Sequence, residues 1–183
     1  MKKFEALIRV YKNKRLILGS IIVVLQIVIG LQNIEPIKIS VFFWDFKIPL
    51  ILIGLTLCIS GIRWLISDEP WILDQVANEE RLQMSFSDLF LIDRNETLSG
   101  YLTQIYRFLG LYVFGLGFFL LSFSTSKMLE IVLVRERVLI VLGLLLSSNI
   151  ILAYFWIPSS HFIYIMWVTI GLYCVSLYNH KKY

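Results

Sequence analysis

Residues 138–157 read VLIVLGLLLSSNIILAYFWI, twenty positions without a charged side chain. An α-helix rises 1.5 Å per residue, so this stretch spans about 30 Å, the thickness of a bilayer's hydrocarbon core. Four further stretches have 17 to 19 residues and contain no Asp, Glu or Lys: Leu16 to Gln32, Ile48 to Ile66, Phe108 to Ser124 and Phe162 to Tyr178. The sequence therefore predicts an all-α integral membrane protein with about five transmembrane helices.

The composition agrees with this fold class. Of the 183 residues, 58% are hydrophobic and only 16% are charged, and the mean hydropathy is +0.77. A soluble domain of this size could not bury so much apolar surface. Cys58 and Cys174 fall inside apolar stretches, so they do not indicate a disulfide framework. The expected surroundings are a lipid bilayer and other membrane proteins, and no nucleic acid.

Six cations crowd the segment before the first stretch: Lys2, Lys3, Arg9, Lys12, Lys14 and Arg15. Such a cluster retains a terminus in the cytoplasm. No small-residue cleavage site follows the first stretch, which we interpret as an uncleaved signal anchor. With five crossings, ten Lys and Arg residues lie on the cytoplasmic side and seven on the other. The sequence predicts a multi-pass protein of the cell inner membrane with a cytoplasmic N-terminus.

Three regions follow from the pattern. Residues 1–68 form a transmembrane hairpin, residues 69–104 an acidic cytoplasmic or interfacial linker, and residues 105–183 a three-helix membrane block. Pro49 can open the second helix of the hairpin, because a first-turn proline loses no intrahelical hydrogen bond. The orientation of the hairpin is fixed by the N-terminal cations, whereas that of the three-helix block depends on the small difference in charge between its loops.

Acidic residues outnumber basic ones by six between residues 67 and 104. After Pro70 the pattern predicts a helix through about residue 83, with an apolar stripe of Ile72, Val76 and Leu82, and Leu73 and Ala77 beside them. This helix either lies on its own membrane domain or presents an acidic docking surface for a basic partner. The candidate docking residues are Glu79, Glu80, Asp88 and Asp93.

The loop between the first two predicted helices carries an unusual order of residues: Gln32-Asn33, Glu35-Pro36-Ile37, Ile39-Ser40-Val41-Phe42-Phe43-Trp44, Phe46 and Ile48-Pro49-Leu50. With its flanking helices, residues 15 to 68, it resembles the lipopolysaccharide assembly protein A domain. The resemblance implies an inner-membrane adaptor of Gram-negative bacteria that works with a tetratricopeptide partner and a membrane protease to adjust lipopolysaccharide synthesis. After residue 68 the chain departs from that family, which usually continues into a cytoplasmic coiled coil.

Motifs for cofactor chemistry are not evident, so the sequence predicts no metal and no cofactor. His161 and His180 are nineteen residues apart in one predicted helix, about 28 Å, which is too far for a shared haem. Cys and His do not occur at zinc-binding spacing. The four linker acids could also bind a metal or act as acid and base, although such acids usually form a solvated face.

Polar and small residues inside the apolar stretches predict helix contacts. Ser147, Ser148 and Asn149 sit at the centre of one stretch, and an amide at that depth should point at another helix and form a hydrogen bond there. A lipid-headgroup or substrate pocket is the alternative. Gly110, Gly115 and Gly117 allow close approach of a neighbouring helix.

Two functions are compatible with these patterns. The first is a non-enzymatic membrane adaptor or small subunit of a bacterial inner-membrane complex, linked to envelope lipid or lipopolysaccharide homeostasis. The second is a small lipid-handling or lipid-modifying enzyme. Its candidate residues are the four linker acids and His161.

Overall fold

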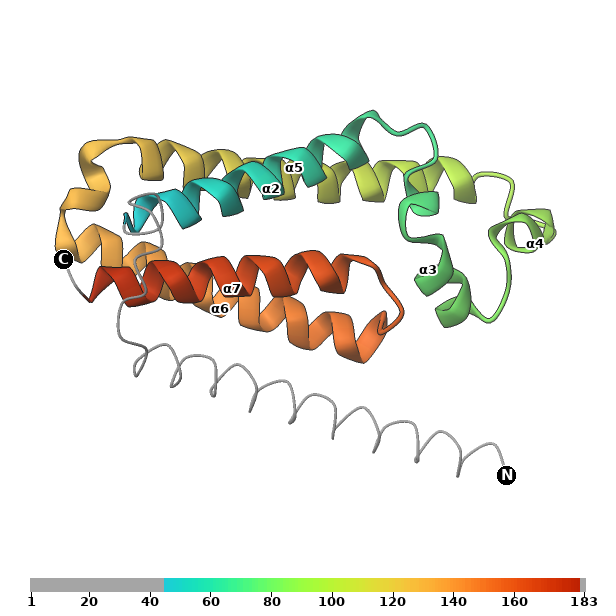
Figure 1. The fold of residues 1–183 in the computed structure, drawn as a ribbon. Coiled ribbons are helices and arrows are strands. Elements are labelled where there is room, and N and C mark those ends of the chain that lie inside the picture. Colours follow the sequence, from blue (N-terminus) through green and yellow to red (C-terminus); the bar gives the residue numbers. More distant parts are fainter. Residues whose placement is uncertain (1–44, 182–183) are drawn as a thin grey trace, which may run out of the picture.

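The computed structural model describes residues 45–181, which fold into helices joined by short turns (Figure 1). The predicted first membrane span at 16–32 and the loop that follows it, 33–44, lie outside the described residues. So do the N-terminal cations and much of the region that resembles the lipopolysaccharide assembly protein A domain.

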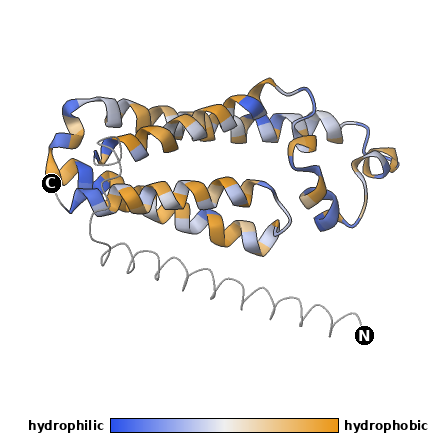
Figure 2. Ribbon diagram, viewed as in Figure 1, coloured by the Kyte–Doolittle hydropathy of each residue, from blue (hydrophilic) through white to orange (hydrophobic). Residues whose placement is uncertain are grey.

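Four helices are long and apolar enough to cross a membrane: α2 (Lys47–Ile66), α5 (Leu98–Thr125), α6 (Val132–Trp156) and α7 (Phe162–His180). They confirm four of the predicted spans. Figure 2 shows apolar residues along their length and polar residues gathered toward their ends. Helix α5 begins ten residues before the predicted apolar stretch, because polar residues extend the same helix beyond the span.

Helices α2 and α5 pack antiparallel through glycines that lie seven residues apart on each helix. A Cβ at Gly61 would lie 2.6 Å from the carbonyl oxygen of Gly110, and one at Gly117 would lie 2.7 Å from that of Gly54. The two backbones are therefore in contact at both crossings, which only glycine permits.

The bundle is also held together at the end where α2 begins, near the short 3₁₀ helix η3 (Lys127–Glu130), and we call this the η3 end. Phe46 is buried there, and its carbonyl accepts a hydrogen bond of 2.8 Å from Ser176 Oγ of α7. Arg135 of α6 lies 4.7 Å from the Phe46 ring centroid, and Lys47 pairs with Glu130 at 3.3 Å. Helix α2 thus packs against both α5 and α7.

At the opposite end, residues 67–97 form a cap: η2 (Pro70–Asp74), α3 (Gln75–Leu82) and α4 (Phe86–Leu91). The expected start of a regular α-helix at Pro70 is wrong, because the first turn is 3₁₀. This turn buries Trp71, whose ring centroid lies 6.3 Å from that of Phe86 and 5.4 Å from that of Phe90.

The predicted apolar stripe of the linker is also corrected. Ile72, Val76 and Leu82 are exposed, whereas Ala77, expected beside them, is buried, as is Trp71. A 3₁₀ turn has 3.0 residues per turn rather than 3.6. Side chains after Asp74 therefore lie on different faces from those expected for one continuous α-helix.

Candidate functional site

Polar side chains meet where the cap contacts α5 and the turn between α6 and α7. Asp74, the last residue of η2, is only 8% exposed. Its Oδ1 lies 3.3 Å from Nδ1 of His161, whose side chain is about half exposed. His161 was a sequence candidate, but Asp74 was not. The two residues are 87 positions apart in the chain, and no local pattern could have paired them.

Asn78 links the cap to α5. Its Nδ2 donates to the hydroxyl oxygen of Tyr106 at 2.9 Å and to the carbonyl of Trp71 at 3.3 Å. Because α5 extends beyond the apolar span, it carries Tyr106 out to meet the cap (Figure 1).

Two further contacts link α3 to the α6–α7 turn. Ser159 Oγ donates a hydrogen bond to the carboxylate of Glu80. The guanidinium of Arg81 lies 4.6 Å from the Trp156 ring centroid. With Asp74 and Asn78, these contacts attach the inner side of the cap to both halves of the bundle.

The predicted docking acids therefore differ in their surroundings. Glu79 accepts hydrogen bonds from Gln75 Nε2 at 2.8 Å and from the Phe86 backbone N–H at 2.9 Å. The Gln75 bond, followed by the Phe86 bond, lowers the pKa of the Glu79 carboxyl. Both bonds hold α3 and α4 in their relative positions, so Glu79 has a local structural role.

Asp88 has a local role as well, because it bonds to Ser85, the N-cap residue of α4. Ser85 Oγ accepts from the Asp88 backbone N–H at 3.0 Å and donates to Asp88 Oδ2 at 2.7 Å. Glu80 is bound to Ser159, as described above. Of the four acids, Asp93 alone has neither a hydrogen bond nor an ion pair with another residue in the range 45–181, and it is exposed.

The pair of Asp74 and His161 resembles the acid–base arrangement in which a carboxylate orients an imidazole. The neighbouring Ser160 is buried, and its Oγ accepts from the backbone N–H of Phe162, the first residue of α7, at 3.2 Å. Within residues 45–181, no group of three His, Cys, Asp or Glu side chains converges to hold a metal ion.

Two buried donors at the cap end lack a hydrogen-bond acceptor among the described residues: Trp64 Nε1 and Arg107 Nε. The Trp64 ring packs against Phe162, with a centroid distance of 4.9 Å. A buried donor without an acceptor costs about 1–3 kcal/mol.

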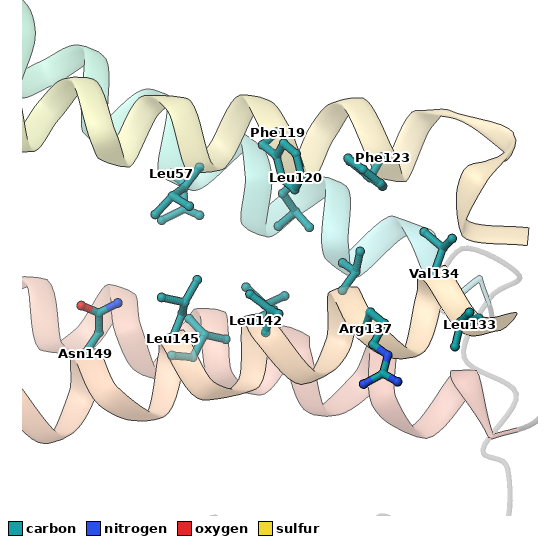
Figure 3. A pocket seen from close by; sticks show the side chains of 14 residues that line it. Leu57, Phe119, Leu120, Phe123, Leu133, Val134, Arg137, Leu142, Leu145 and Asn149 are labelled. Carbon is teal, nitrogen blue, oxygen red and sulfur yellow. The ribbon is translucent and has the colours of Figure 1, made fainter. Parts of the chain in front are cut away.

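The membrane region contains an apolar groove of about 420 Å³ between α5 and α6 (Figure 3). Phe119 and Phe123 of α5 line one side and Leu142 and Leu145 of α6 the other, while Leu57 of α2 adds to the lining. We call this site the α5–α6 groove.

The structure places the predicted helix-packing residues on different surfaces. Asn149 lines the α5–α6 groove, and Ser147 and Ser148 are exposed. None of the three bonds to another described helix; the side of α6 that packs into the core carries Leu139, Leu142 and Leu146 instead. Gly110 and Gly117 contact α2, whereas a Cβ at Gly115 would meet open space. Gly54 and Gly61 complete the α2–α5 contact and were missed, although their seven-residue spacing is visible in the sequence.

Comparisons with protein-family models, curated proteins and solved structures gave no match to this chain. The structure itself defines a helical protein in which four helices can cross a membrane and a polar cap covers one end.

Proposed function

We propose that this chain is a non-enzymatic multi-pass adaptor, or small subunit, of a bacterial inner-membrane complex, and that its cap contacts the partner. One observation carries the proposal: the inner side of the cap is attached to α5 and to the α6–α7 turn, while its outer side is exposed. A surface held in this way is preorganised, so binding costs less conformational entropy than it would for a mobile loop.

The outer side of the cap combines apolar and acidic groups. Val76 is 73% exposed and Leu91 is 83% exposed. Asp93 and Glu96 are exposed on the segment that links α4 to α5. Exposed apolar groups rimmed by charge are typical of protein contact sites. The acidic rim favours a partner with a basic surface, because complementary charge speeds encounter.

The resemblance of residues 15–68 to the lipopolysaccharide assembly protein A domain supports a role in envelope lipid homeostasis. The N-terminal cations support a cytoplasmic N-terminus and hence a cytoplasmic cap. A cap on that side would meet cytoplasmic partners or the cytoplasmic loops of other inner-membrane proteins.

The test is affinity purification of the tagged chain from native membranes, followed by mass spectrometry. Asp93→Lys combined with Glu96→Lys should lower partner recovery several-fold at low ionic strength, and high salt should remove the difference. Glu136→Lys is the control, because Glu136 is exposed on α6 at the η3 end. Glu79, Glu80 and Asp88 are unsuitable for this test, since their replacement would disturb the cap itself.

The proposal fails if the reversed cap and the control recover the same partners in equal amounts at low salt. In that case the acids form only a solvated surface.

The paired Asp74 and His161 favour a second candidate, a lipid-handling enzyme in which His161 acts as the base. Lipid turnover by the purified chain that is lost in His161→Ala would support this candidate over the adaptor.

A further inference from the structure

We propose that the α5–α6 groove is the docking site for the chain's own first apolar stretch, residues 16–32. This inference is independent of the adaptor function, because it concerns the packing of the chain on itself. It assigns the groove one occupant and places the predicted fifth helix against two particular helices of the bundle.

The groove needs an apolar occupant. It has a volume of about 420 Å³ and is partly open to the surroundings of the bundle. Its lining comes almost entirely from aliphatic and aromatic side chains of α5 and α6 (Figure 3). An apolar helix would recover the van der Waals contacts that these side chains otherwise lack.

The chain enters the bundle at the correct end for this. Phe46 and Lys47 contact Arg135 and Glu130 at the η3 end, and the groove residues Leu133 and Val134 lie beside them in sequence. Only twelve residues, 33–44, separate the stretch from Asp45. Residue 32 must therefore lie near the η3 end if this short linker stays outside the hydrocarbon core, and the stretch then runs antiparallel to α2 and α6.

The lengths and polar positions agree with this direction. From Leu133 to Asn149 the groove side of α6 covers about 24 Å at 1.5 Å per residue, as does the stretch from Gln32 back to Leu16. Gln26 then comes within about one turn of Arg137. Asn149 comes level with the start of the stretch, where first-turn backbone N–H groups lack intrahelical acceptors.

Charge favours the same arrangement. The six cations that precede residue 16 would emerge at the cap end of the bundle. The segment 67–104 at that end has eight acidic and two basic residues. The opposite direction would place these cations at the η3 end, beside Lys127, Arg135 and Arg137.

Disulfide crosslinking in native membranes tests the assignment. In a background of Cys58→Ala and Cys174→Ala, Val141→Cys on the groove is combined in turn with a cysteine at each of positions 23–26. These positions cover one helical turn at the depth of Val141, which is exposed and lines the groove. Phe118→Cys is the matched control, because it is 60% exposed on α5 at a similar depth, beside the contact of Gly117 with Gly54, and does not line the groove.

We expect an intramolecular crosslink to Val141→Cys at one or two of the four positions, at least five-fold above the crosslink to Phe118→Cys. Equal crosslinking to both sites, or none to Val141→Cys, would overturn the proposal and leave the groove to lipid. A crosslink between two chains would also overturn it, because the occupant would then be a second copy. If the background without native cysteines does not fold, the same pairs in the native background are mapped by mass spectrometry of digested protein.

Discussion

Glu79 shows, at the scale of one residue, how a surface acid can have a structural role. Its hydrogen bonds from Gln75 and Phe86 lower the pKa of the carboxyl below its ordinary value of 4.5. Ionisation of Glu79 therefore stabilises the folded state. This stabilisation is fully present above pH 4.5 and is lost as the pH falls through the lowered pKa. We expect the Phe86 amide to exchange with solvent faster across that range, after correction for the intrinsic effect of pH.

The control is Glu79→Gln, which keeps an acceptor oxygen but cannot ionise. Hydrogen exchange followed by mass spectrometry of the 83–90 segment should show no corresponding step in this variant. A step of the same size in both proteins would assign the effect to another group.

Sequence reasoning at this scale identified residue types but not their partners. It selected His161 and the acids of the cap by residue type and by their place outside the apolar spans. Asp74 was overlooked because one Asp among eight linker acids has no distinguishing local signal, and its role depends on burial beside a residue 87 positions away. Asn149 was expected to bond to another helix, yet depth in the membrane does not determine which side of a helix faces its neighbours.

At the scale of elements, the α2–α5 pair depends on backbone contact at its glycines. Gly61→Val should destabilise the protein by about 1–3 kcal/mol or more, because the added side chain meets the Gly110 carbonyl and the Phe114 backbone. Gly115→Val places the same side chain on α5 in open space. Both variants replace a helical glycine with valine, and their intrinsic changes in helix propensity are therefore similar. Thermal unfolding in detergent should therefore show a clear loss for Gly61→Val relative to Gly115→Val. Equal melting temperatures would show that α2 and α5 do not pack at this crossing.

Four spans could be predicted because hydropathy and length depend only on local sequence, and α2 and α7 match their predicted bounds within two residues. The start of α5 could not be predicted in this way, since its first ten residues mix polar with apolar side chains and lack the continuous hydropathy of a span. One of them, Tyr106, bonds to Asn78 of the cap. The start of the cap helix was wrong for a similar reason: burial of Trp71 favours a 3₁₀ turn that no apolar period indicates.

At the scale of the whole molecule, the two ends of the bundle should lie on opposite sides of the membrane. The cluster of six N-terminal cations predicts a cytoplasmic N-terminus, and one crossing by residues 16–32 then places the η3 end outside. Helix α2 returns the chain, so the cap is expected in the cytoplasm. Val76→Cys on the cap and Met128→Cys in η3 are suitable probes, because the two side chains are 73% and 54% exposed.

A membrane-impermeant maleimide applied to intact cells should label Met128→Cys, and it should reach Val76→Cys only after the inner membrane is permeabilised. The parent chain is the blank, since Cys58 and Cys174 are buried within apolar helices. Labelling of Val76→Cys but not Met128→Cys in intact cells would invert the topology. The cap would then face away from the cytoplasm, and its partners would have to be sought there, because the cytoplasmic side would display the basic η3 end.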